Sequence, residues 1–208
     1  MIKQGKYIVI EGGDGTGKST QVDKLATLLR SQGHDVLVVE EPGGTPMADA
    51  IRLILKDKRL PRHPKTNIGL FTAARIDLWE NIIAPALTSG KIIVSSRNYF
   101  STLVYQGYGE GMDLDYIEQI SQLSLPKRYY RPDIAIVLSA EERLERLEKR
   151  DQADFTAAND FFESKPDDFQ ARLDAGYLEL AKKYRLPVVS AIGTPDEVAQ
   201  RIAELIKI

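Results

Sequence analysis

Apolar positions along the chain fall into short runs that alternate with longer stretches of helical periodicity. Five runs are rich in Val and Ile and apolar on consecutive residues: 7–11, 35–40, 91–95, 134–138 and 187–192. Uninterrupted apolar runs of this length are typical of strands that are covered on both faces. We therefore predict an α/β fold in which helices lie on both sides of a parallel five-stranded sheet.

The stretches between these runs predict the helices, at residues 18–32, 47–56, 68–89, 114–124, 140–150, 167–183 and 195–208. Gly33 and Gly90 directly follow two of these stretches, where glycine commonly ends a helix. Thr194 precedes a proline and two acids, the pattern of an N-cap and first turn. Residues 151–166 are polar and lack a clean period, so we predict a mobile lid at about 150–166.

A glycine-rich motif follows the first predicted strand and opens the first helix. Its sequence from Gly12 to Ser19 fits G-x-x-x-x-G-K-S, in the strand-to-helix context that this motif requires. Glycines let backbone N–H groups turn towards an anion, and the helix N-terminus adds a positive dipole. Lys18 can reach the β and γ phosphates, while the Ser19 hydroxyl can ligate Mg²⁺. The residues predicted to bind ATP or GTP are Gly12, Gly13, Asp14, Gly15, Thr16, Gly17, Lys18, Ser19 and Thr20.

Asp14 is an unusual residue for such a loop, because its carboxylate would repel a triphosphate. We interpret it as turned towards an acceptor hydroxyl or a metal-bound water. A solvated loop acid is an equally good interpretation from the residues alone.

Residues that follow the predicted strands indicate an acceptor site, because ligands of doubly wound sheets gather beyond the carboxyl ends of the strands. Glu40 and Glu41 follow the second strand in a sharp turn. Arg97 follows the third, and its guanidinium suits bidentate binding of an acceptor phosphate.

Three further residues indicate recognition of a nucleobase. The amide of Gln106 offers both a donor and an acceptor to the edge of a pyrimidine. Phe71 and Arg75 lie four residues apart and share a helix face, which places a stacking ring beside a guanidinium. The alternatives are a core position for Phe71 and a solvated surface charge for Arg75.

Composition limits the possible functions. The 208 residues suit a single domain, 1–208, and the net charge of −2 gives no field that favours nucleic acid or an anionic membrane. The chain has no cysteine and no apolar run of membrane-spanning length. We expect a cytoplasmic protein that acts on small molecules.

Along nearly its whole length the sequence resembles the thymidylate kinase family. The matching segments are YIVIEGGDGTGKST, EPGGT at 41–45, FTAAR at 71–75, STLVYQG at 101–107, RPD at 131–133 and GYLELA at 176–181. The resemblance implies a P-loop NTPase-type nucleoside monophosphate kinase fold with sheet order 2-3-1-4-5, a lid, ATP as donor, and a homodimer.

The resemblance also implies roles for the base and sugar contacts. Asp14 is similar to the family's acid that holds the sugar 3′-hydroxyl, and Phe71 to the ring that stacks on thymine. Arg75 and Gln106 resemble the residues that read the thymine edge. Tyr105 resembles the residue under the deoxyribose, where a 2′-hydroxyl would clash.

On the phosphate and adenine sides, Arg97 matches the arginine of the acceptor phosphate. Arg146 resembles the arginine beside adenine, and Gly193 lies in a segment similar to the adenine-side loop. Ser101 and Glu41 belong to the matching segments and are counted among the substrate-binding residues. Gly15 stands where one family style carries its catalytic arginine, so the chain resembles the style with that arginine in the lid.

Four positions depart from the family pattern. Ser96 and Ser139 stand where aspartate is usual at the ends of the third and fourth strands, and Glu40 replaces a frequent arginine. Phe161 replaces the lid arginine, a loss that matters because transfer requires neutralisation of charge. We expect Arg150 to supply that charge instead.

The sequence therefore predicts a kinase that phosphorylates dTMP to dTDP with ATP in dTTP synthesis. The expected catalytic residues are Lys18, Arg97, Arg150 and Asp14, and the expected Mg²⁺ ligands are Ser19 and Glu41. Two alternatives stay open: a kinase for another or several nucleoside monophosphates, and a nucleotide-binding sensor with weak catalysis.

Overall fold

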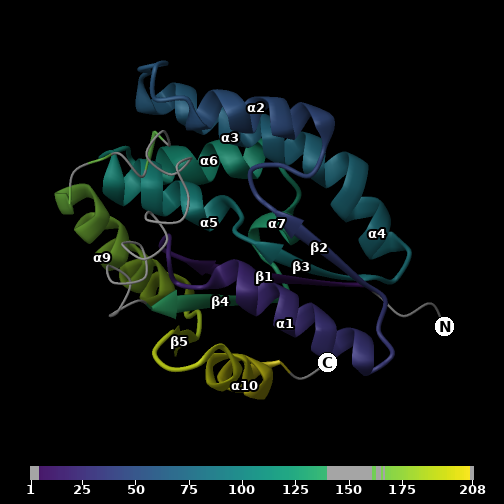
Figure 1. Ribbon diagram of the computed structural model, residues 1–208. Helices are drawn as coiled ribbons and strands as arrows, with labels where there is room; N and C mark the ends of the chain where they lie inside the picture. The colour runs from purple at the N-terminus through teal and green to yellow at the C-terminus, as the bar shows by residue number, and fades with distance from the viewer. Residues whose placement is uncertain (1–4, 140–160, 163–164, 166, 207–208) are drawn as a thin grey trace.

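A parallel sheet forms the centre of the computed structural model, which describes residues 5–139, 161–162, 165 and 167–206. The strands are β1 (Lys6–Gly12), β2 (Val36–Glu40), β3 (Ile92–Ser96), β4 (Ile134–Ser139) and β5 (Val188–Ser190). Their order in the sheet is β2-β3-β1-β4-β5 (Figure 1). The predicted fold class and strand order are confirmed.

Helices cover both faces of the sheet, because successive residues of each strand point to opposite sides. Ile8 and Ile10 of β1 pack with one cluster, which holds Val22 of α1 (Lys18–Ser31) and Val198 of α10 (Pro195–Leu205). Tyr7 and Val9 face the other and larger cluster, which most of the remaining helices supply. Both faces of β1 are thus buried, as the unbroken apolar run predicted.

The other helices lie away from α1 and α10, on the side of the sheet with the larger cluster (Figure 1). They are α2 (Pro46–Lys56), α3 (Pro64–Leu78), η1 (Trp79–Ile83), α4 (Ala84–Thr88), α5 (Tyr99–Thr102), η2 (Leu103–Gly109), α6 (Leu114–Ser124), α7 (Lys127–Tyr130) and α9 (Asp167–Tyr184). No helix in this described part of the chain is long and apolar enough to cross a bilayer.

The helix predicted at 68–89 starts earlier and is not regular. It begins with Pro64 in its first turn, where the missing N–H is no loss, and His63 caps it by accepting from the Lys65 N–H. The π-helical turn η1 interrupts it, with the Ala84 N–H donating to the Trp79 carbonyl five residues earlier. Pro85 follows at once and lacks an N–H, so the regular bonding pattern cannot pass through this turn.

Three helical segments, α5, η2 and α7, were not predicted. The stretch 99–109 combines glycines, aromatic and β-branched residues without a helical period. Tertiary packing overrides this local preference, since η2 is buried against α9. Gly109 permits the contact, because a Cβ there would lie 2.6 Å from the Phe169 ring. The predicted helix at 140–150 and most of the predicted lid lie outside the described residues.

Candidate active site

One cleft of about 430 Å³ opens beyond the carboxyl ends of β1, β2 and β3. It is bounded by the glycine-rich loop, the turn after β2, helix α3 and the segment of α5 and η2. The predicted site residues that line it are Asp14, Gly15, Gly17, Lys18, Ser19, Thr20, Glu41, Phe71, Arg75, Arg97, Ser101, Tyr105 and Gln106. The phosphate-binding loop and the acceptor residues therefore face the same space.

Several predicted residues are not among those that line the cleft. Gly12, Gly13 and Thr16 form the body of the loop, where the Thr16 hydroxyl donates to the Gly13 carbonyl at 3.0 Å. Gly193 lies in the loop before α10. Arg146 and Arg150 lie outside the described residues.

The phosphate-binding loop has the backbone that its glycines predict. Gly12, Gly15 and Gly17 all have positive φ angles, 144°, 79° and 85°. A Cβ at Gly12 would also lie 2.7 Å from the Leu138 carbonyl, so glycine is required there on two counts. The Lys18 ammonium donates to the Gly13 carbonyl at 2.7 Å, which folds the side chain back over the loop that it serves.

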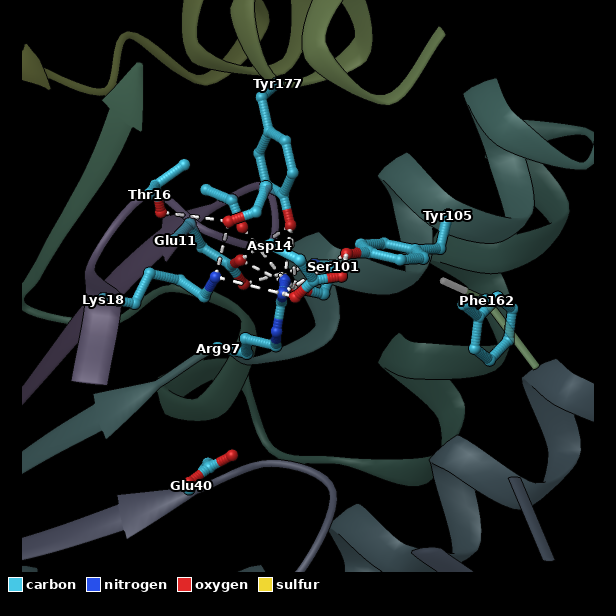
Figure 2. Close-up of polar contacts among 12 residues, drawn as sticks. Glu11, Asp14, Thr16, Lys18, Glu40, Arg97, Ser101, Tyr105, Phe162 and Tyr177 are labelled. Carbon is cyan, nitrogen blue, oxygen red and sulfur yellow. Dashed lines mark hydrogen bonds and ion pairs between the residues drawn. The ribbon is translucent and has the colours of Figure 1, made fainter. Parts of the chain in front are cut away.

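Arg97 forms a partly buried ion pair with Asp14 at the centre of the site (Figure 2). The hydroxyl of Tyr105 donates to Asp14 Oδ2 at 2.7 Å and lies 3.2 Å from Arg97 Nη2. Burial raises the pKa of Tyr105 well above its ordinary value, so this hydroxyl stays protonated and can donate. Asp14 is thus turned inward towards a cation and a hydroxyl, which excludes the solvated loop acid.

The other edge of the Arg97 guanidinium faces Ser101 and Tyr177. Arg97 Nη1 donates to the Ser101 hydroxyl at 3.1 Å and to the Tyr177 hydroxyl at 2.8 Å. Arg97 itself has φ 72°, a strained value for a residue with a side chain, and it directly follows β3. Burial alone would lower the pKa of Arg97, but the oxygens of Tyr105, Tyr177 and Asp14 raise it well above the ordinary value.

Glu11, which the sequence analysis did not select, holds the segment that carries Arg97. It is fully buried and accepts from the backbone N–H groups of Asn98 at 2.8 Å and Ser101 at 3.2 Å. It also accepts from the Ser101 hydroxyl at 2.7 Å and the Tyr177 hydroxyl at 3.3 Å. An acid in an otherwise apolar, buried strand was the signal that could have found it, because unpartnered carboxylates are rarely buried.

Arg75 organises the opposite end of the cleft from helix α3. It is 3% exposed, and it donates to Glu41 at 2.8 Å, to the Thr102 hydroxyl at 2.5 Å and to the Asn98 carbonyl at 2.8 Å. The alternative of a solvated surface charge is therefore wrong. These bonds involve three different nitrogens of a group with five N–H donors, so further N–H groups remain for a ligand.

Both carboxylate oxygens of Glu41 accept hydrogen bonds. Besides Arg75, the hydroxyl of Tyr129 donates to its two oxygens at 2.7 and 2.6 Å. Burial raises the pKa of Glu41 even though Arg75 and Tyr129 counteract this effect. The carboxylate thus holds Arg75 in place, and Tyr129 is a second residue that the sequence analysis did not select.

Phe71 lies at the wall of the cleft, half-buried, with its ring 5.2 Å from the Arg75 guanidinium carbon. Phe162 packs against it at a centroid distance of 6.0 Å and against Tyr105 at 5.6 Å. Rings this close already touch. A base could stack on this face of Phe71 only if Phe162 moved aside.

The positions that depart from the family pattern have local partners. Glu40 is exposed and pairs with Arg52 at 3.1 Å, and Figure 2 shows it apart from the Arg97 cluster. Ser96 is buried and lines the cleft, and Ser139 ends β4. Phe161 lies beneath two cations, with Arg62 4.3 Å and Lys165 4.7 Å from its ring centroid.

The loop around Gly193 is fixed by helix α10. Gly193 has φ 104°, and a Cβ there would lie 2.5 Å from a Glu197 oxygen. Thr194 and Glu197 form a complete capping box. Gln21 of α1 donates to the Pro195 carbonyl at 3.0 Å, which ties this loop to the helix that follows the phosphate-binding loop.

Comparisons with known proteins agree with this geometry. The family model for thymidylate kinases matches residues 10–202. A thymidylate kinase of Syntrophotalea carbinolica is 38% identical over 201 residues, which cover 94% of this chain and 92% of the relative. One of Caulobacter vibrioides is 38% identical over 206 residues, with 98% and 96% covered. The crystal structure of thymidylate kinase from Ehrlichia chaffeensis matches with a TM-score of 0.76 and 26% identity over 98% of this chain and 99% of that one. The chain belongs to the thymidylate kinase family.

Proposed function

We propose that this chain transfers the γ-phosphoryl group of ATP to dTMP, giving ADP and dTDP for the synthesis of dTTP. The observation that carries the proposal is the shared cleft, where the phosphate-binding loop faces Arg97, Arg75, Phe71 and Gln106. A nucleotide-binding sensor would not need this second set of residues. The names of the relatives support dTMP as the acceptor.

Positioning and electrostatics carry the proposed reaction, since phosphoryl transfer needs little covalent help from the protein. Lys18 lies at the mouth of the loop, where its ammonium can leave the Gly13 carbonyl for the β and γ phosphates. Arg97 binds the acceptor phosphate in exchange for part of its bond to Asp14. The acceptor oxygen is already ionised at neutral pH, so no general base is required.

Asp14 and Tyr105 lie beside Arg97 and so are placed for the sugar of the acceptor. Once the acceptor phosphate occupies Arg97, the Asp14 carboxylate can accept from the 3′-hydroxyl. Tyr105 is then the residue that a 2′-hydroxyl would meet. Ser101 supports both, because its hydroxyl lies between Arg97 and Glu11.

The residues present fit Mg²⁺ held mainly by the nucleotide. Among the described residues no cluster of three or more His, Asp or Glu side chains could hold a metal alone. Mg²⁺ commonly uses one or two protein groups together with waters and phosphates, and Ser19 and Glu41 both line the cleft. Ser19 is the better direct ligand, because both Glu41 oxygens already accept from Arg75 and Tyr129. When bound, the ion would neutralise phosphate charge.

We propose Arg150 as the lid cation that replaces the family arginine at position 161. Phe161 cannot supply charge, and the Lys165 ammonium in the same lid is already paired with Glu110 at 3.4 Å, so the transferring group needs another lid cation. The change Arg150→Ala should lower kcat about 100-fold with little change in the KM for ATP. Steady-state kinetics measure both, with Lys149→Ala as the neighbouring control. Unchanged kcat would exclude Arg150.

We also propose a homodimer in the cytoplasm. Large apolar side chains stay exposed on α2 and α3, with Met47 at 59%, Leu53 at 73% and Ile76 at 38%. Trp79 is not part of this surface, because it is buried in the core. Light scattering of the purified chain would measure its mass in solution, and a monomer at micromolar concentration would contradict the dimer.

The cytoplasmic location is a separate proposal. A chain without cysteine suits a reducing compartment such as the cytoplasm.

The test of the function is ADP release with Mg-ATP against dTMP, dUMP, dCMP, dGMP, dAMP and UMP. We expect dTMP to be preferred and UMP to be poor. Preference for another acceptor would favour a kinase of different or broader range. ATP binding without release of ADP in the presence of any acceptor would favour the sensor.

A further inference from the structure

Gln106 lines the cleft, and of its two amide atoms the nitrogen is hydrogen-bonded and the oxygen is not. Its Nε2 donates to Glu110 Oε2 at 3.2 Å, and both residues belong to the segment that ends η2. Its Oε1 is buried and accepts no hydrogen bond from any described residue. An unpaired buried oxygen is costly, so a site for a donor is indicated beside it.

We propose that Glu110 is a positioning residue that selects the base: it holds the Gln106 amide so that only a pyrimidine with a proton on N3 is accepted. The inference rests on the proposed function, because it concerns the base of the same acceptor nucleotide. A carboxylate accepts and cannot donate. The amide nitrogen must therefore face Glu110, and the amide oxygen must face away from it.

Three donors besides Gln106 fix the orientation of Glu110 and its neighbours. Asn67 of α3 donates its amide nitrogen to both Glu110 oxygens, at 3.1 and 3.3 Å. Asn67 is itself oriented, since Arg62 donates to its amide oxygen at 2.5 Å. Lys165 adds an ion pair at 3.4 Å to a Glu110 side chain that is only 5% exposed. Asn67 and Lys165 both donate to Glu110, whose oxygens can only accept, so rotating the Gln106 amide would place oxygen against oxygen.

Phe161 also stabilises this network, through contacts with its two cations. Its ring lies under both cations of the network, Arg62 and Lys165, at 4.3 and 4.7 Å. A face of an aromatic ring attracts cations. An arginine at this position would repel both. The departure from the family pattern at 161 is thus consistent with a stabilised Glu110 network.

The fixed amide oxygen gives a defined base preference. Thymine and uracil both carry a proton on N3, which the Gln106 oxygen can accept. Cytosine has a lone pair at N3, so the same oxygen would repel it and stay unpaired. The contact reads N3 alone and cannot distinguish thymine from uracil.

The test compares kcat/KM for dTMP and dCMP in the wild type and in Glu110→Gln. Glutamine keeps the shape but offers a donor as well as an acceptor, so the Gln106 amide can rotate. We expect the dTMP to dCMP ratio to fall at least about tenfold, mainly through KM, with the KM for ATP unchanged. Asp115→Asn, an exposed acid on the next helix, is the control and should keep the wild-type ratio.

An unchanged ratio, or an equal loss with both nucleotides, would overturn the role of Glu110. If Glu110→Gln does not fold, N3-methylated dTMP supplies the test on the wild type. It should be phosphorylated at least about tenfold less efficiently than dTMP, and equal efficiency would overturn the inference. Failure of the proposed function is distinguishable, because the wild type would then phosphorylate neither dTMP nor dCMP.

Discussion

The two ends of the cleft, which we propose bind the phosphates and the base, are built in different ways. At the phosphate end, one continuous segment, 12–19, supplies the loop, its lysine and its acid. At the base end, Arg75 is bonded to Glu41, Asn98 and Thr102, which lie 34, 23 and 27 residues away in sequence. The first is a local structure; the second exists only after distant segments have packed.

This difference predicts which end of the cleft controls the rate and which controls acceptor choice and stability. The phosphate end acts through charge placed by the backbone, so changes there should alter rate for every acceptor. The base end acts through buried, mutually fixed polar groups. Changes there should alter the choice of acceptor and the stability of the fold together, because buried networks fail when one member is left unpaired.

The largest expected effect comes from Lys18→Met at the phosphate end. Loss of the ammonium removes charge that the transferred group needs, and kcat/KM should fall roughly 1000-fold for all acceptors. The ratio of dTMP to dCMP should stay as in the wild type. Steady-state kinetics measure both quantities. The control is Lys24→Met. It removes an ammonium that is paired with Asp196 at 2.6 Å, and neither residue lines the cleft. A changed dTMP to dCMP ratio in Lys18→Met would contradict the proposed difference between the two ends.

The base end should respond to Arg75→Met with a loss of stability. Glu41 would remain buried without a cation, with only the Tyr129 hydroxyl donating to it; the loss of one partner of a buried ion pair typically costs about 3–5 kcal/mol of the free energy of unfolding. Chemical denaturation measures this loss. Adding Glu41→Gln to the same chain should restore most of it, since the two residues act as a pair. A stable single variant, or strict additivity in the double variant, would contradict the account of a buried network.

A smaller effect is expected at Glu118, which belongs to neither end and links α6 to α9. Lys183 and Tyr184 both donate to its Oε1 at 2.5 Å. Burial raises the pKa of Glu118, but these donors outweigh it and hold the pKa below the ordinary value of 4.5. A lowered pKa stabilises the fold above the unfolded-state value, and this contribution is lost as the pH falls through the folded-state value.

Glu118→Gln should therefore lower stability by at most about 1 kcal/mol at pH 7. The difference from the wild type should shrink once the pH falls below 4.5, the ordinary pKa of this group, and vanish at lower pH. Thermal unfolding over that range measures it, and activity at pH 7 should be unchanged at both ends of the cleft. A difference that grows in acid would show that the sign is wrong.

The phosphate end could be predicted because its residues are contiguous and its motif places glycine at the positions that adopt a positive φ. The strand order was implied by the family resemblance. Glu110 and Tyr129 could not be predicted, since their importance depends on partners such as Asn67, 43 residues away from Glu110. From the sequence, Phe161 could be interpreted only as the loss of an arginine, because a sequence does not show that Arg62 and Lys165 lie over its ring.

The helix interruption at η1 and the unpredicted η2 have different origins. Pro85, which the sequence shows, accounts for the interruption, whereas η2 depends on its packing against α9, about which local periodicity carries no information. Glu11 is an intermediate case. Its charge within an apolar strand was visible, but its partners at Asn98 and Ser101 were not.

The central claim is that both ends of the cleft serve one transfer from ATP to a nucleotide. The most direct measurement supplies ATP labelled at its γ-phosphate together with dTMP and Mg²⁺, and identifies the product that carries the label. The account predicts that the label appears in dTDP. Label that is released as inorganic phosphate, or that stays in ATP while ATP is bound, would contradict it.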